Sequence, residues 1–184
     1  MATGPVAPRR LLCVAPLVPA GGVDTLLTSF GMLAGDHPEL SVEVLGTGPL
    51  SQVLHDQAAY LGLADRVHFR GRPTTSAVRA AVHGCAVLVL PHRHGTGVVP
   101  TAEVALAEAL ASARPVVATP LAPHPDLLDA GSVVPPGAPT VLAQTLESVL
   151  ARSRSAADGA CPAGTAAPDP DGHLLRRVWL RVLR

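Results

Sequence analysis

The chain has 184 residues, of which 48% are hydrophobic and 15% are charged, and its formal net charge at pH 7 is +0. The apolar fraction is sufficient for a sizeable core and excludes global disorder. The balanced charge gives no support for nucleic acid as a partner. Cys13, Cys85 and Cys161 lack the spacing of a zinc site or a disulfide framework, and the first two stand in apolar runs typical of buried thiols.

Short apolar runs alternate along the chain with segments of helical period. The expected strands are residues 11–15, 41–45, 67–70, 86–90 and 115–118. The first expected helix is capped by Asp24 and ends at Gly35. The other expected helices are residues 53–61, 75–83, 103–112 and 141–153. This alternation predicts an α/β fold, a Rossmann-like parallel sheet of about six strands with helices on both faces.

The predicted organisation has four parts. Residues 1–10 form an N-terminal extension, 11–154 the Rossmann-like domain, 155–172 a flexible linker and 173–184 a short amphipathic helix. We expect the last helix to dock on this or a partner domain, with membrane-surface attachment as the lesser alternative because so short a helix buries little. No apolar run reaches the ~20 residues of a membrane span, so we predict a cytoplasmic protein, with a signal peptide as the alternative.

Ligands of open parallel sheets bind beyond the carboxyl ends of the strands. Loops rich in glycine follow the expected strands there, and they contain Gly21-Gly22, Gly46-Thr47-Gly48, Gly71-Arg72 and residues 92–97. Glycine allows backbone N–H groups to approach a phosphate at a helix N-terminus. The glycine spacing is not GxGxxG, which argues against a nicotinamide or flavin dinucleotide.

The last of these loops carries His92, Arg93 and His94. One interpretation is a cationic cluster that binds a diphosphate, with the Arg93 guanidinium acting bidentately. The other is a solvated polar loop. His92, His94 and His124 form a third, looser alternative as zinc ligands, although no carboxylate completes that set.

Longer strings carry a resemblance to a known family. LLCVAPLVPAGGVDTLLTSF, VEVLGTGPL, YLGLADRVHFRGRP, CAVLVLP and EALASARPVVATP occur in this order, followed by PDLLDAG and VVPPGAP. From about residue 11 to residue 152, the chain resembles the C-terminal, donor-binding domain of retaining GT-B glycosyltransferases (glycosyltransferase family 4 type). The resemblance implies binding of a nucleotide-diphosphate sugar and a hexosyltransferase-type reaction. It also implies a separate Rossmann-like acceptor domain or subunit, and no metal or other cofactor.

Two cations of the family pattern are replaced in this chain. The family string G-R-L-x-x-x-K-G aligns with residues 15–22, so that Pro16 stands at the Arg position and Gly21 at the Lys position. These cations stabilise the leaving diphosphate in the family, which neither replacement can do. As substitutes the resemblance suggests the backbone amides of Gly21 and Gly22, with Arg72 or Arg93 as the cation.

The family also has two glutamates eight positions apart. The second matches Glu108, which the resemblance assigns to the ribose of the donor, and the first falls on Pro100, with Glu103 three residues later. The predicted donor-binding residues are Gly21, Gly22, Gly71, Arg72, Arg93 and Glu108, and the catalytic candidates are Arg72, Arg93 and Glu103. Because these motifs are incomplete, the alternative is a catalytically deficient interaction module or a truncated relic of such an enzyme.

Overall fold

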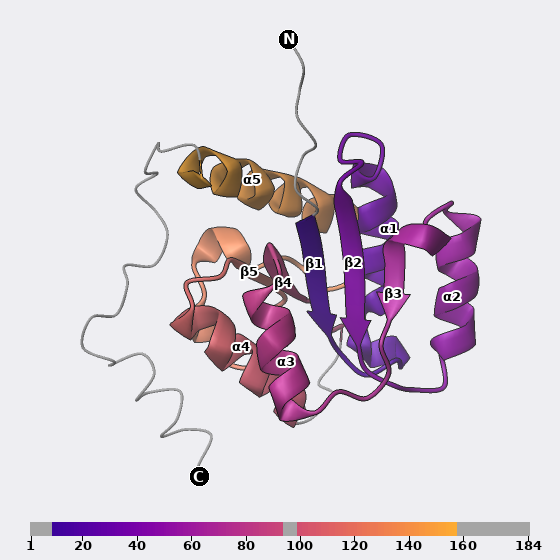
Figure 1. Ribbon diagram of the computed structural model, residues 1–184, viewed down its shortest axis with the longest axis horizontal. Coiled ribbons are helices and arrows are strands. Elements are labelled where there is room, and N and C mark those ends of the chain that lie inside the picture. Colours follow the sequence, from indigo (N-terminus) through magenta and orange to yellow (C-terminus); the bar gives the residue numbers. More distant parts are fainter. Residues whose placement is uncertain (1–8, 94–98, 158–184) are drawn as a thin grey trace.

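The computed structural model describes residues 9–93 and 99–157, with side chains to residue 153. Its centre is a parallel sheet in the order β3-β2-β1-β4-β5 (Figure 1). The strands are β1 (Arg9–Val14), β2 (Leu40–Leu45), β3 (Val67–Phe69), β4 (Val87–Leu90) and β5 (Val116–Ala118). The predicted Rossmann-like α/β class is confirmed.

The expected number of about six strands is wrong for the described residues. Beyond β5, a single parallel bridge joins Ala118 to Val133 in place of a sixth strand. The chain after β5 is rich in proline, and Pro135 and Pro136 follow the bridge residue Val133 after one further residue. Proline lacks the N–H that a sheet ladder requires, so the pairing ends after one bridge.

In the described ranges, five helices cover the two faces of the sheet. They are α1 (Val23–Leu33), α2 (Ser51–Tyr60), α3 (Thr75–His83), α4 (Pro100–Ala111) and α5 (Pro139–Ala157), and single turns η1 (Pro19–Gly21), η2 (Ala64–Arg66), η3 (Pro125–Leu127) and η4 (Ala130–Ser132) connect the elements. The helix predicted at 75–83 is confirmed at both ends, whereas α4 begins three residues before its predicted start. Among the described helices, none has the length and hydropathy to cross a membrane.

The core has two layers because side chains alternate along each strand. Leu11 and Cys13 pack on the side of α1, α2 and α5, whereas Leu12 and Val14 pack on the side of α3 and α4. Burial of Cys13 raises the pKa of its thiol to about 12, and burial raises that of Cys85 to about 11. The prediction that these two thiols are buried is confirmed.

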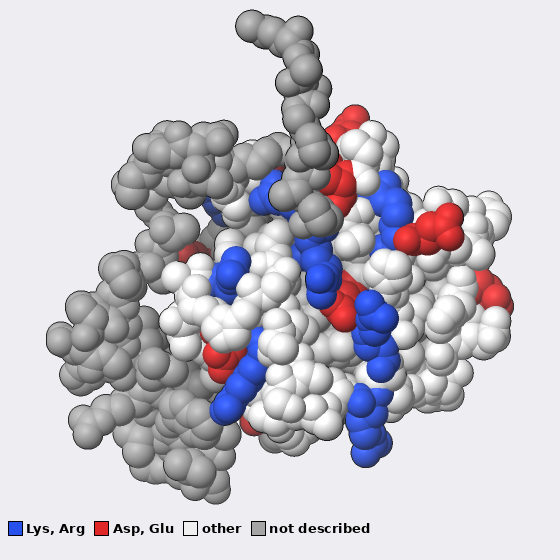
Figure 2. Space-filling model, in the orientation of Figure 1, with Lys and Arg blue, Asp and Glu red and all other residues white. Residues whose placement is uncertain are grey.

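The face of α3 and α4 is polar where it reaches β2 and β3. Glu43 on β2 lies between two arginines, with its carboxylate 2.5 Å from Arg10 and 3.1 Å from Arg70. Figure 2 shows basic side chains on both sides of an acidic one over this part of the sheet. The two guanidinium groups compensate for the burial of the carboxylate, and their own side chains are 42% and 61% exposed to solvent.

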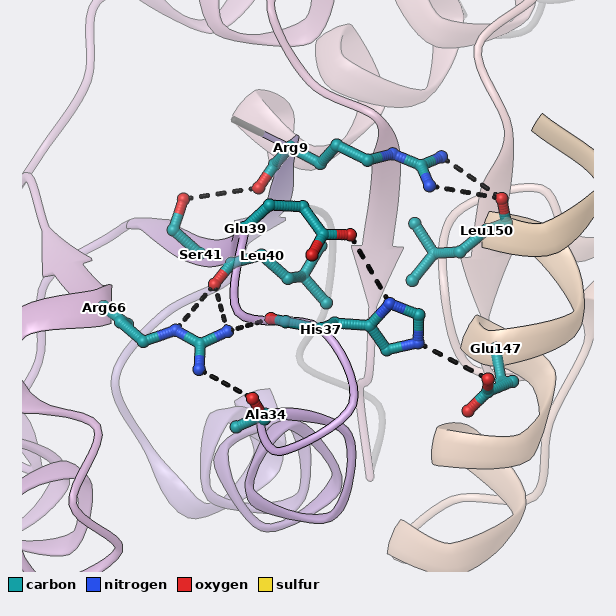
Figure 3. A network of polar contacts seen from close by, with 9 residues as sticks. All are labelled: Arg9, Ala34, His37, Glu39, Leu40, Ser41, Arg66, Glu147 and Leu150. Atoms are coloured by element: carbon teal, nitrogen blue, oxygen red, sulfur yellow. Dashed lines mark hydrogen bonds and ion pairs between the residues drawn. The ribbon is translucent and has the colours of Figure 1, made fainter. Parts of the chain in front are cut away.

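A polar network fastens α5 to the amino edge of the sheet (Figure 3). The guanidinium of Arg66 donates to the carbonyl oxygens of Ala34, His37 and Leu40. The buried ring of His37 reaches α5, where its Nε2 lies 3.4 Å from Oε1 of Glu147. These contacts satisfy carbonyl groups at the end of α1 and the start of β2, at the opposite end of the strands from their carboxyl ends.

Candidate functional site

The strand order places the topological switch point between β1 and β4. The chain winds outward from β1 through β2 to β3, and then returns to the other side of β1 with β4. Ligands of open α/β sheets bind in the crevice beyond the carboxyl ends of the strands at this point. The loops after β1 and β4 meet here, since the backbone N–H of Arg93 donates to the carbonyl of Ala20 at 2.8 Å.

The predicted glycine pair after β1 is required by the packing of these loops. A Cβ on Gly22 would lie 1.8 Å from the carbonyl oxygen of Pro91, and Gly22 has a φ of +70°. A Cβ on Gly21 would lie 2.1 Å from the carbonyl oxygen of Pro16. Both positions therefore exclude a side chain, whatever ligand binds.

The amides of this pair differ in what they offer to a ligand. The N–H of Gly21 donates to the carbonyl of Val18 at 2.9 Å, so this predicted phosphate donor is already engaged. Gly22 is the N-cap of α1, and within the described part of the chain no side chain caps that helix. The first-turn amides of α1 thus have no side-chain acceptor and lie at the positive end of the helix dipole.

Asp24 does not cap α1, and that prediction is wrong. Because the left-handed backbone of Gly22 starts the helix earlier, Asp24 lies within the first turn. There its carboxylate forms an ion pair with Nη2 of Arg93, and Nε of Arg93 donates to Oγ1 of Thr25 at 3.0 Å. The predicted cation Arg93 therefore lies at the N-terminus of α1, already paired with a carboxylate.

His92 does not join Arg93 in a cationic cluster, as one interpretation of this loop expected. Its ring is fully buried, and neither ring nitrogen has a hydrogen-bond partner among the residues that the structure describes. Burial lowers the pKa of His92 from its ordinary value, against a smaller opposing effect of the Leu90 carbonyl, and so keeps the ring neutral. The zinc alternative depends on His94, which lies outside the described residues.

Arg72 and Gly71 lie on the loop after β3. Gly71 has a φ of +72° and open space around it. Arg72 is exposed, and within the described ranges it makes no hydrogen bond or ion pair. Because β3 is two strands from β1, this loop is about 10 Å from the switch point. Arg72 is thus accessible to a ligand, but the structure does not place it beside Arg93.

The two glutamates of α4 lie at different levels of the sheet. Glu103 is in the first turn, near the carboxyl ends of the strands. Glu108 lies further along the helix, about 7.5 Å from Glu103 at a rise of 1.5 Å per residue. Its carboxylate contacts His83 and Arg79 at the end of α3. The structure therefore places Glu103, and not Glu108, on the same edge as Arg93.

The comparisons identify the family. Residues 8–152 match the family described as "Glycosyl transferases group 1". The chain belongs to this family.

One curated relative, WcaL of Salmonella typhimurium, is assigned to the glycosyltransferases of colanic acid biosynthesis. It is 29% identical to this chain over 165 residues. The match covers 82% of this chain and 41% of WcaL, so the chain spans about two fifths of that relative.

Solved structures share the fold. The C-terminal domain of LpcC from Francisella tularensis, a glycosyl transferase group 1 family protein, superimposes with a TM-score of 0.69 and 16% identity, covering 80% of this chain and 78% of that one. Anabaena HepE in complex with UDP gives a TM-score of 0.70 and 18% identity, covering 95% and 47%.

Proposed function

We propose that this chain is the donor-binding part of a retaining glycosyltransferase and that it binds a nucleotide-diphosphate sugar at the switch point of its sheet. The observation that carries the proposal is the position of Arg93 at the uncapped N-terminus of α1. A guanidinium and a helix N-terminus without a side-chain cap together form a site that favours phosphate oxygens. Membership of the family supports a sugar donor, and the UDP complex of HepE supports a nucleotide as its carrier.

In the proposed reaction, the bond between the anomeric carbon and the diphosphate oxygen breaks, the acceptor hydroxyl oxygen bonds to that carbon on the same face, and the proton of that hydroxyl passes to the leaving diphosphate. The charge that develops on the diphosphate would be stabilised by the first turn of α1 and by Arg93, with Arg72 as a second cation. We expect Glu103, on the same edge of the sheet as Arg93, to accept hydrogen bonds from the ribose in place of Glu108, to which the family resemblance assigned that role.

This proposal needs no metal or other cofactor, because protein cations would neutralise the diphosphate. The acceptor would bind to a separate Rossmann-like domain or subunit, which HepE and WcaL have the length to include. In this proposal the domain described here binds the donor, and transfer of the sugar also requires the acceptor-binding part. We further propose that the protein acts in the cytoplasm.

A second function, a catalytically deficient interaction module, is favoured by one observation. Pro16 and Gly21 stand where the family carries its two cations, and Asp24 neutralises the remaining guanidinium of Arg93. A domain with so little positive charge at this site could keep its fold without binding a nucleotide-sugar donor.

Calorimetric titration of the full chain with UDP, GDP and ADP separates the two functions. A donor domain should bind one of these nucleotides saturably, and Arg93→Gln should weaken that binding about tenfold or more, since it removes a charge-assisted hydrogen bond. Arg152→Gln is the matched control, because it removes the same charge from an exposed position on α5. A folded chain that binds none of the nucleotides at millimolar concentration would favour the interaction module.

A further inference from the structure

Asp24 lies where an anionic ligand of α1 would be expected. Its carboxylate is in the first turn of that helix, and its partner is the guanidinium of Arg93. Helix N-termini and arginines both favour negatively charged groups, whether these belong to a ligand or to the chain. The chain thus supplies its own anion to the cation of the proposed donor site.

Both members of this pair are held in place by contacts that do not involve the carboxylate. The backbone carbonyl of Asp24 accepts hydrogen bonds from Thr28 Oγ1 at 2.9 Å and from Gln57 Nε2 at 3.0 Å. Arg93 is anchored by its backbone N–H and by Nε, which donates to Thr25. When the Asp24 side chain is replaced by an isosteric amide, these contacts therefore remain and should keep both residues in position.

The pair is also accessible. The side chain of Arg93 is 33% exposed and that of Asp24 is 36% exposed. Ion pairs with this exposure are weak because water screens them. An anion with several negative charges and good geometry can therefore replace a single carboxylate on the guanidinium.

We propose that Asp24 is an internal competitor for the anionic part of the donor, so that binding exchanges the partner of Arg93 from the Asp24 carboxylate to a phosphate. This inference rests on the proposed function, because it concerns the same site. The displaced carboxylate stays near the ligand, and it repels a bound anion more strongly as the charge of that anion increases. Asp24 thus sets the affinity of the site for diphosphates without contributing a bond to them.

The test uses the full chain and Asp24→Asn, titrated with inorganic pyrophosphate, UDP and uridine at low ionic strength. Removing the competing charge should tighten the binding of pyrophosphate and UDP about 3- to 10-fold and leave that of uncharged uridine unchanged. The matched control is Asp36→Asn, which removes the same charge from an exposed position beyond the other end of α1, and it should change affinities less than about twofold. Asp24→Glu keeps the charge and should give no gain.

The outcomes distinguish this inference from the proposed function. If the unaltered chain binds UDP and Asp24→Asn binds it no more tightly, Asp24 is not a competitor, although the donor site stands. If Asp24→Asn gains affinity for pyrophosphate while neither chain binds a nucleotide, the competitor is supported and the nucleotide donor is wrong. If neither chain binds pyrophosphate or UDP, both proposals fail.

Discussion

Nε2 of His83 lies 2.8 Å from Oε1 of Glu108, across the contact between α3 and α4. Arg79 approaches the other oxygen of the same carboxylate at 3.5 Å. The glutamate that the family resemblance assigns to ribose is thus the acidic centre of a contact between two helices. Glu103, one turn and a half earlier on α4, has no such partner among the described residues.

This difference predicts separate effects of two substitutions. Glu103→Gln should weaken binding of the preferred nucleotide about fivefold or more, because it removes a charged acceptor for ribose hydroxyls. Glu108→Gln should leave that affinity nearly unchanged and lower the free energy of unfolding by about 1 kcal/mol or less, as for a partly exposed ion pair. Calorimetry and urea unfolding measure the two quantities. If Glu108→Gln weakened nucleotide binding and Glu103→Gln did not, Glu108 would be the residue that contacts the ribose.

Gly22 should tolerate no side chain. Gly22→Ala would place a methyl group against the carbonyl of Pro91 at a positive φ, and we expect it to cost more than about 2 kcal/mol of stability. Gly35→Ala is the control, since a Cβ there meets nothing within 4 Å. We expect that control to change stability by less than about 0.5 kcal/mol. Equal unfolding midpoints in urea for the two variants would show that the loops after β1 and β4 do not meet as described.

The amino edge of the sheet should make stability depend on acid pH. Burial alone would raise the pKa of Glu39, but a backbone hydrogen bond, His37 and Arg9 outweigh it and lower the pKa below its ordinary 4.5. Such a group stabilises the fold fully above its unfolded pKa and loses that contribution as the pH falls through the folded value.

Glu39→Gln should therefore flatten the loss of stability below about pH 4.5, measured by urea unfolding at a series of pH values. Asp65→Asn, at an exposed position of η2, is the control and should follow the unaltered chain. If the free energy of unfolding fell equally steeply below pH 4.5 for Glu39→Gln and for the unaltered chain, this assignment would be wrong.

The buried thiols should not react in the folded protein. With pKa values raised to about 12 and 11, Cys13 and Cys85 are protonated at pH 8, and burial also blocks access to them. Cys161→Ser removes the third cysteine, so labelling with a thiol reagent reports on these two alone. We expect almost no labelling in buffer and labelling of both in denaturant. Rapid labelling in buffer would show that the core opens readily.

The fold could be predicted from local patterns, because apolar runs of strand length alternate with segments of helical period. The contacts of the site could not. Asp24 and Arg93 are separated by 69 positions, and they meet because β4 returns to lie beside β1, an order that no local pattern specifies. His92 lies two residues after the buried strand β4, but its polar neighbours in sequence favoured an exposed loop. Its burial follows from packing that also involves Thr119, whose hydroxyl donates to the His92 carbonyl at 2.7 Å.

The location of the nucleotide site can be mapped by the amide chemical shifts of a ¹⁵N-labelled chain during titration with the preferred nucleotide. We predict that the largest changes fall on Gly22, Val23 and Arg93, with smaller changes near Glu103 at the start of α4. Changes centred on His37 at the amino edge, or on His83 between α3 and α4, would contradict a donor site at the switch point.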